Sequence, residues 1–192
     1  MVYPAKHFIT PEEYLTLEEM AETKHEYFNG LIYDLAGTSR NHNFIAGNIY
    51  MALRSRLDPT PCEVYSSDVR VLVQANGLYT YPDVSVVCGT PEFIHRQTDT
   101  LPNPTLIVEV LSPSTAAYDR GQKFELYKAL TSLRDYLLVE QDRVAVEYFS
   151  RAKGSRKWSG QTFAELKQFI NLRAVGCELP LREKYRKVEL SG

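Results

Sequence analysis

The stretch PTLIVEVLSPSTAAYDRGQKFELY, residues 104–127, decides the architecture of the chain. Its first half contains two apolar groups, Leu106-Ile107-Val108 and Val110-Leu111, and such a run is typical of a strand buried on both faces. Glu109 stands in the middle of this run. An ionised carboxylate is costly to bury without a partner, so Glu109 is predicted to be paired, protonated or bound to a cation.

Helical spacing follows the predicted strand of residues 105–111. From Arg120 to Leu130 the apolar residues recur with the period of a helix, which predicts a helix over that range. Ser112 and Ser114 lie between the strand and the helix, and they are expected to cap the helix because serine favours turns and helix starts.

The C-terminal third continues the sheet and then changes character. The segment DYLLVEQDRVAVEYFSR, residues 135–151, predicts two strands joined by a Gln141-Asp142 turn. The final stretch LPLREKYRKVEL, residues 179–190, is rich in charge, so we expect a peripheral helix or turn that belongs to the surface more than to the core.

Before the central stretch, helix and hairpin signals alternate. Thr10 followed by Pro11-Glu12-Glu13 marks a helix start, and the helix is expected to run to about Glu22. Asn29-Gly30 between two short apolar runs is the strongest short signal for a β-hairpin. The segment HNFIAGNIYMALRSRL has helical spacing, and Asp58-Pro59 ends it.

Residues 63–89 read as two β-rich runs joined at Ala75-Asn76-Gly77, and with residues 105–111 they predict a three-stranded ladder. The order is then helix, hairpin, helix, three strands, helix, two strands and a tail. This order predicts a single α/β (α+β) domain over residues 1–192, with a central mixed β-sheet flanked by α-helices. A chain of 192 residues is long enough to bury about 70% of the surface that it would expose when unfolded.

Composition and charge exclude several classes of protein. The net charge of −2 provides no general basic field for avid, nonspecific binding to nucleic acid. Cys62, Cys88 and Cys177 are far apart and form no C-x-x-C pair, so we expect buried thiols and neither a disulfide framework nor a zinc site. No window approaches the roughly 18 apolar residues of a membrane span, and the N-terminus has no signal-peptide core, so a cytoplasmic location is expected.

Several familiar catalytic and nucleotide-binding motifs are absent from the sequence. His25-Glu26 begins like the zinc-protease pattern H-E-x-x-H, but Asn29 stands where the second histidine is required. Neither Ser112 nor Ser114 lies in a G-x-S-x-G elbow, and no phosphate-binding or dinucleotide-binding glycine pattern occurs.

Two carboxylates and one lysine remain as candidates for chemistry. Asp83 lies in the β-rich run YPDVSVV, much as Glu109 lies in its own. If the two strands are adjacent, these like charges meet, and a divalent cation between them resolves the repulsion. Oxygen ligands without histidine or cysteine favour Mg²⁺ or Mn²⁺, and Lys123 on the following helix is placed to reach back and stabilise a phosphoryl transition state.

Each of these residues also has a purely structural interpretation. An aspartate after proline is often only the entry to a strand, a strand glutamate can face solvent, and most helical lysines are solvated. The three residues together favour a catalytic site more than any one of them does.

Four segments carry a resemblance to a known family. YPDVSVV, LIVEVLSPST and YDRGQKFELY, preceded by KHEYFNG, closely resemble the Uma-type restriction endonuclease family, a branch of the PD-(D/E)XK nuclease superfamily. The resemblance covers nearly the whole chain and implies a restriction-endonuclease-like core. It implies that Pro82-Asp83 is the PD element, that Glu109 is the second acid and that Glu26 contributes a further acid. Most of the superfamily has the lysine two residues after the second acid, where this chain has Leu111, and the family pattern places it at Lys123.

His42 and Tyr127 also fall at positions of the family motif, without a defined role. Asp119 is instead expected to cap the following helix, because aspartate before a helical run is a common start signal. Many nucleases of the superfamily act as dimers, so the resemblance implies a homodimer.

The predicted function is metal-dependent hydrolysis of DNA phosphodiester bonds by an endonuclease, with Asp83 and Glu109 as ligands of Mg²⁺ or Mn²⁺ and with Glu26 and Lys123 in the catalytic set. One alternative is a noncatalytic nucleic-acid-binding or assembly module that retains the fold. A phosphoesterase acting on small molecules is another. The basic segment RAKGSRKW, Arg151 to Trp158, either contacts phosphates and stacks on a base or forms a solvated hairpin tip.

Overall fold

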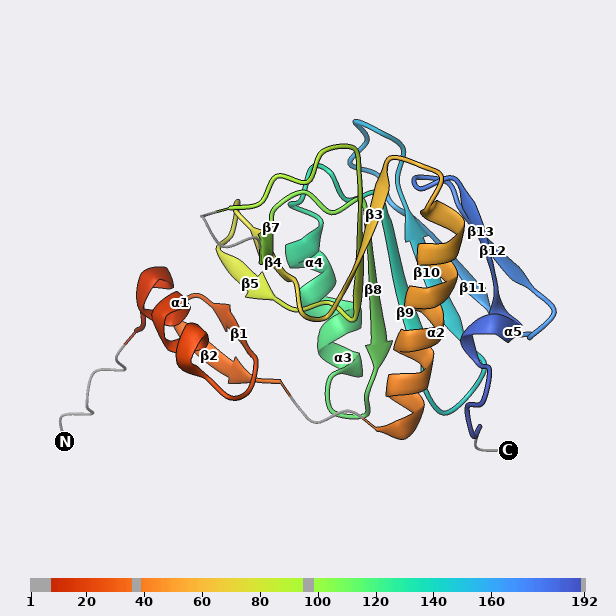
Figure 1. The fold of residues 1–192 in the computed structure, drawn as a ribbon, viewed down its shortest axis with the longest axis horizontal. Helices are drawn as coiled ribbons and strands as arrows, with labels where there is room; N and C mark the ends of the chain where they lie inside the picture. The colour runs from red at the N-terminus through yellow and green to blue at the C-terminus, as the bar shows by residue number, and fades with distance from the viewer. Residues whose placement is uncertain (1–7, 36–38, 95–98, 191–192) are drawn as a thin grey trace.

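The computed structural model describes residues 8–35, 39–94 and 99–190 (Figure 1). In this part of the chain, six strands form a mixed sheet in the order β11-β10-β9-β8-β6-β3. The strands are β3 (Cys62–Ser66), β6 (Val84–Cys88), β8 (Leu106–Leu111), β9 (Asp135–Glu140), β10 (Val146–Ser150) and β11 (Ser159–Phe163). β8 and β9 are parallel and the other neighbours antiparallel, which confirms the predicted central mixed sheet.

β8 lies inside the sheet and is covered on both faces, as its apolar run predicts. Val108 and Val110 pack with α2 (Arg40–Leu57) in one core cluster, whereas Ile107 and Leu111 pack with Phe124 in another. In Figure 1, α2 runs along one side of this sheet and the helices that follow β8 lie on the other. All six residues of β8 are therefore buried, Glu109 among them.

A second sheet carries the N-terminal hairpin. It has the order β2-β1-β5-β4-β7 in the described residues, with β1 (His25–Phe28), β2 (Leu31–Asp34), β4 (Arg70–Val73), β5 (Leu78–Thr80) and β7 (Thr100–Leu101). Asn29 and Gly30 both have positive φ, 49° and 79°, as a tight hairpin turn requires, so the predicted hairpin is confirmed. α1 (Pro11–Met20) begins as predicted, with a capping box between Thr10 and Glu13.

The predicted turn at Ala75-Asn76-Gly77 is confirmed, because it joins the antiparallel strands β4 and β5, but each β-rich run forms two strands that belong to different sheets. A turn at residues 67–69 separates β3 from β4, and Pro82, which lacks an N–H for a ladder, lies between β5 and β6. The predicted three-stranded ladder is nevertheless present, since β3, β6 and β8 are neighbours.

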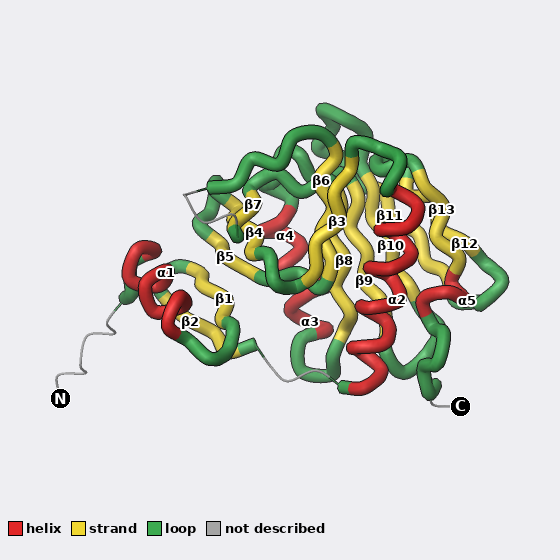
Figure 2. Tube along the Cα trace, viewed as in Figure 1, coloured by secondary structure: helices red, strands yellow, loops and turns green. Residues whose placement is uncertain are grey.

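The helix predicted from Arg120 to Leu130 occupies a different range. Helical structure covers residues 116–127 without a break, as α3 (Ala116–Tyr118), the π-helical turn η1 (Asp119–Lys123) and α4 (Phe124–Tyr127); Figure 2 labels α3 and α4. Ser112 shapes the turn before it, because its hydroxyl accepts the N–H of Thr115. Asp119 is not the cap that we expected; it lies inside the helical segment, with its own N–H bonded to the Thr115 carbonyl.

Two expectations about the remaining residues are wrong. Cys62 and Cys88 are not separate thiols, because they are direct partners in the pairing of β3 with β6 and form a disulfide.

The C-terminal stretch is not peripheral: β12 (Phe169–Leu172) and β13 (Cys177–Pro180) form a two-stranded sheet, and α5 (Leu181–Lys184) follows. Leu181 and Tyr185 are buried in the core that also contains residues of α2. Within the described residues, no helix is long and apolar enough to cross a membrane.

Lys184 is a fully buried lysine outside the cleft described below. Its ammonium donates a hydrogen bond to the Leu179 carbonyl at 2.9 Å, and burial lowers the pKa of Lys184 to about 7. At Lys184 the unfolded chain therefore binds more protons than the native protein between about pH 7 and the usual lysine pKa of about 10.5, so Lys184 contributes a rise in stability with pH in that window.

We expect Lys184→Met to raise the free energy of unfolding at neutral pH by about 1–3 kcal/mol, because the substitution keeps an apolar stem and removes a buried amine. The variant should also lose the rise in stability above pH 7. Urea unfolding at about pH 6 and about pH 9 measures both effects, with the exposed Lys167→Met as control. An unchanged pH dependence in Lys184→Met would contradict the buried-amine interpretation.

Candidate active site

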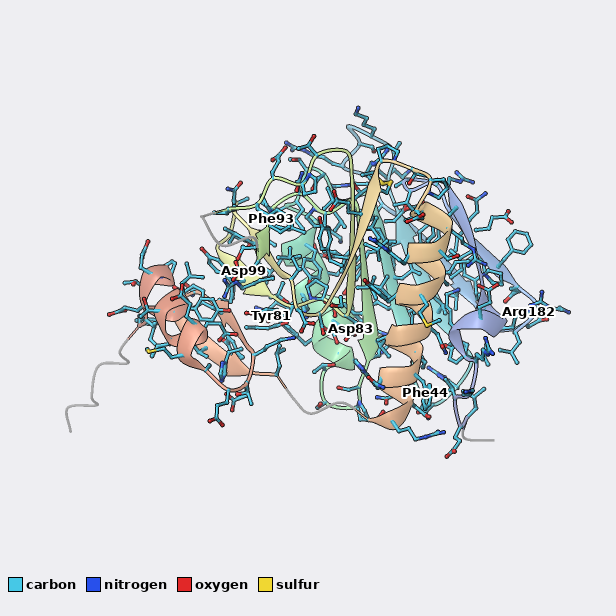
Figure 3. The ribbon with its side chains drawn as sticks, viewed as in Figure 1. Phe44, Tyr81, Asp83, Phe93, Asp99 and Arg182 are labelled. Atoms are coloured by element: carbon cyan, nitrogen blue, oxygen red, sulfur yellow. A yellow bond between two sulfur atoms is a disulfide. The ribbon has the colours of Figure 1, made fainter. Side chains whose placement is uncertain are left out.

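A cleft of about 810 Å³ lies between the N-terminal hairpin, the turn before β6, the end of β8 and the helical segment 116–127. All four sequence-predicted site residues, Glu26, Asp83, Glu109 and Lys123, line it. In the view of Figure 3, Asp83 lies between the N-terminal segment and α2. The cleft is thus built from segments far apart in the sequence.

Asp83 and Glu109 are set side by side by the register of two antiparallel strands. Val84 pairs with Val108, so continuing the ladder by one residue places Asp83 opposite Glu109 on the same face of the sheet. Asp83 precedes β6 by one residue, and its Oδ2 accepts the backbone N–H of Val110 at 2.7 Å. This hydrogen bond ties the Asp83 carboxylate to the strand that carries Glu109.

Lys123 extends from η1 into a group of three buried carboxylates. Its Nζ lies 2.6 Å from Glu26 Oε1, 3.0 Å from Glu109 Oε1 and 3.6 Å from Asp119 Oδ1. All four residues are 4–6% exposed. Asp119 therefore belongs to the site, although the sequence analysis did not assign it there. Its position four residues before Lys123 was the signal that could have identified it.

One lysine cannot neutralise all the acids around it. Burial alone lowers the pKa of Lys123, but Glu109, Glu26 and Asp119 together raise it well above its usual value, so Lys123 is charged. Burial raises the pKa of Glu109 to about 8, although Lys123 opposes the shift. The cluster therefore titrates as a unit in which Lys123 keeps its proton and an acid, chiefly Glu109, holds a proton at neutral pH in the absence of a cation.

Neutral hydroxyls complete the buried side of the cluster. The Tyr127 hydroxyl donates a hydrogen bond to Glu109 Oε1 at 2.8 Å, and Thr80 donates to Glu26 Oε1. Burial, together with the neighbouring Glu109 and Glu26, raises the pKa of Tyr127 well above its usual value, so the phenol stays protonated. Tyr127 therefore acts here as a fixed hydrogen-bond donor that orients the Glu109 carboxylate.

His42 contacts the other acid. It lies in the first turn of α2, and its Nε2 is 3.3 Å from Asp83 Oδ2. Burial lowers the pKa of His42, but the hydrogen bond and the charge of Asp83 outweigh burial and raise it. His42 is placed to hold the orientation of the Asp83 carboxylate.

The donor atoms suit a hard cation. In the described ranges, no three His, Cys, Asp or Glu side chains converge as a preformed metal-binding group. Mg²⁺, however, is commonly bound through one or two carboxylates with water and substrate phosphates as the other ligands, and adjacent Asp83 and Glu109 fit that mode. Three carboxylates contact Lys123 and Asp83 lies beside Glu109, so acidic groups outnumber the basic ones here, and a cation would offset part of this charge.

The basic segment Arg151 to Trp158 lies elsewhere. It connects β10 to β11, and none of its residues lines the cleft. The Arg151 guanidinium lies 4.7 Å from the Trp158 ring centroid and donates hydrogen bonds to the carbonyls of Leu133 and Lys128. Arg151 thus has a structural role. The sequence analysis treated it in the same way as the exposed lysines of the segment.

The fold of this chain, a mixed sheet flanked by helices, is the restriction-endonuclease-like fold. It matches the crystal structure of "a putative nuclease belonging to DUF820" from Anabaena variabilis with a TM-score of 0.74 over 92% of this chain and 97% of that one, at 18% sequence identity.

Sequence comparison identifies the family. The family model Uma2, described as "Putative restriction endonuclease", matches residues 11–182, so the chain belongs to the Uma2 family. Two similar proteins come from Synechocystis sp. (strain ATCC 27184 / PCC 6803 / Kazusa). "Uncharacterized protein slr1290" is 43% identical over 143 residues, 74% of each chain, and "Uncharacterized protein sll1609" is 37% identical over 158 residues, 82% of this chain and 89% of that protein.

Proposed function

We propose that the protein is an Mg²⁺- or Mn²⁺-dependent endonuclease that hydrolyses DNA phosphodiester bonds in this cleft. The observation that carries the proposal is the convergence of Asp83, Glu109, Glu26 and Lys123, from a turn, two strands and a helix, on one cleft. Membership of a family described as restriction endonucleases supports nucleic acid as the substrate class.

Asp83 and Glu109 would hold the cation, which supplies Lewis-acid polarisation of the phosphodiester and lowers the pKa of the attacking water. The Val110 N–H and His42 fix Asp83, and Tyr127 fixes Glu109, so both carboxylates are oriented before substrate binds. Lys123 supplies the positive charge nearest these acids and would stabilise the negative charge that develops on the phosphoryl oxygens. Glu26 holds the Lys123 ammonium in place.

The direct test is incubation of the pure protein with supercoiled plasmid and with single-stranded DNA, in Mg²⁺, Mn²⁺ or EDTA. We expect nicked and linear products with either metal and none with EDTA. Asp83→Asn should lose the activity while the exposed Glu165→Gln retains it. Cleavage that survives EDTA or Asp83→Asn would refute this site. DNA binding without cleavage under every condition would favour the noncatalytic module.

A further inference from the structure

A second cleft, of about 400 Å³, lies at the opposite end of the central sheet. It is lined by the start of β9, the loop between β10 and β11, and the turn between β12 and β13. Asp135, the first residue of β9, pairs with Leu106 at the start of β8, whereas the candidate active site lies toward the end of β8. Figure 1 shows the same separation, with the β10–β11 loop at the top and α3 near the bottom.

Positive charge predominates among the residues that line this cleft. Five cationic side chains line it: Arg134, Arg151, Lys153, Lys157 and Arg173. Its only acidic lining residue among the described ones is Asp135, which is 1% exposed and already accepts hydrogen bonds from the Tyr148 hydroxyl at 2.8 Å and the Ala174 N–H at 3.0 Å. Burial also raises the pKa of Asp135. In a chain of net charge −2, this concentration of cations is a local positive field.

The five cations divide into two kinds. Arg134 donates a hydrogen bond to the Ala174 carbonyl, and Arg151 donates to the carbonyls that precede β9, so these two arginines are part of the framework. Lys153, Lys157 and Arg173 are exposed, and in the described part of the chain none of them forms an ion pair. They come from two different segments and line the same opening, where the buried Asp135 is the only acid among the described lining residues.

We propose that this cleft binds phosphate groups, with Lys153, Lys157 and Arg173 as the charged contacts. Ser150 and Ser159 also line the cleft; the Ser159 hydroxyl donates a hydrogen bond to the Ser150 carbonyl, and both hydroxyls can rotate toward phosphate oxygens. An open cleft whose free cations stand on separate loops suits the repeated charges of a nucleic-acid backbone, and a free phosphate shares the same chemistry. The site does not depend on the proposed hydrolysis, because it lies at the other end of the sheet from Glu109.

The test compares two matched triple variants. Lys153→Ala/Lys157→Ala/Arg173→Ala removes the three free cations and leaves the structural arginines in place. Arg54→Ala/Lys167→Ala/Arg182→Ala removes three exposed cations elsewhere and changes the net charge equally; Arg182 is labelled at the outer surface in Figure 3. The ligands are a fluorescent single-stranded oligonucleotide, a duplex of the same sequence and inorganic phosphate, all in EDTA so that no cleavage occurs. Trp158, the only tryptophan of the chain, adjoins Lys157 and stacks on Arg151, so its fluorescence reports binding locally.

We expect the first triple variant to weaken oligonucleotide binding by about tenfold or more at moderate salt, and to reduce the slope of log K against log salt by about 2. The control triple should leave both unchanged. Loss of only the inorganic phosphate response of Trp158 would also support the site and assign it to free phosphate. Equal behaviour of the two triples with all three ligands would overturn the proposal. Plasmid cleavage is measured separately. A wild-type protein that binds the oligonucleotide in this cleft but does not cleave DNA would refute the proposed nuclease function and would still support the phosphate-binding site.

Discussion

Replacing Lys123 with alanine is expected to abolish DNA cleavage and to lower the free energy of unfolding by about 3–5 kcal/mol, because in the described residues no other cation forms an ion pair with these buried acids. Lys123 lies within 3.6 Å of Glu26, Glu109 and Asp119, and all of these side chains are nearly excluded from water. The effect on stability thus follows from the same geometry as the effect on catalysis.

The pH dependence gives this prediction a distinct signature. In Lys123→Ala the pKa values of Glu109 and Asp119 should rise further, since burial and mutual repulsion act without the opposing ammonium. The native variant would then bind more protons than its unfolded chain, so its deficit in stability should shrink as the pH falls. Mg²⁺ or Mn²⁺ should stabilise the variant more than the wild type, because a cation replaces part of the missing charge.

Chemical unfolding across a pH series, with and without metal, measures these effects. Lys128→Ala is the matched control, since that lysine directly follows the same helical segment but is paired with the exposed Glu125. If Lys123→Ala has the stability and the cleavage activity of the wild type, Lys123 neither stabilises the buried acids nor takes part in catalysis.

The second large effect is expected for Glu109→Gln, which should lower cleavage by about 10³-fold while leaving the metal-free protein as stable as the wild type or more so. Glutamine retains the shape and an acceptor oxygen for the Tyr127 hydroxyl, and Lys123 keeps Glu26 and Asp119 as partners. The substitution removes the carboxyl whose ionisation burial opposes most strongly.

The sign of the stability change follows from the shifted pKa. The folded pKa of Glu109, about 8, lies above its ordinary value of 4.5, so the native wild type binds more protons than the unfolded chain between these values. The contribution of Glu109 to wild-type stability should therefore fall as the pH rises through that window, and Glu109→Gln should lack this contribution.

Thermal melting with a series of metal concentrations completes the test. Wild-type protein should melt at a higher temperature as Mg²⁺ or Mn²⁺ increases, and Glu109→Gln should lose most of that shift, whereas the exposed Glu165→Gln should keep it. A Glu109→Gln variant that is less stable at high pH, responds fully to metal and still cleaves would show that Glu109 is only a structural acid.

Local patterns in the sequence were sufficient for several elements and for Asp83, Glu109 and Lys123 as candidates, whereas Glu26 was identified only through the family resemblance. The apolar run around Glu109, the Asn29-Gly30 turn and the capping box at Thr10 each depend on neighbours in the chain, and the structure confirms the elements that they predict. Glu109 was identified because its charge conflicts with its local pattern, which is a signal that needs no knowledge of the fold.

What only the tertiary structure decided are the relations between distant segments. The contacts of Lys123 with Glu26 and Glu109 join segments that no period of 2 or 3.6 residues relates, and the hydrogen bond from Thr80 to Glu26 spans 54 positions. The disulfide between Cys62 and Cys88 also depends on the pairing of two strands that are distant in the sequence. The C-terminal segment has the charge of a surface element, but long-range packing buries part of it in the core. Local propensity determines which segments become strands or helices, but long-range packing decides which acids share a lysine, and in this chain that packing creates the charge imbalance at the candidate site.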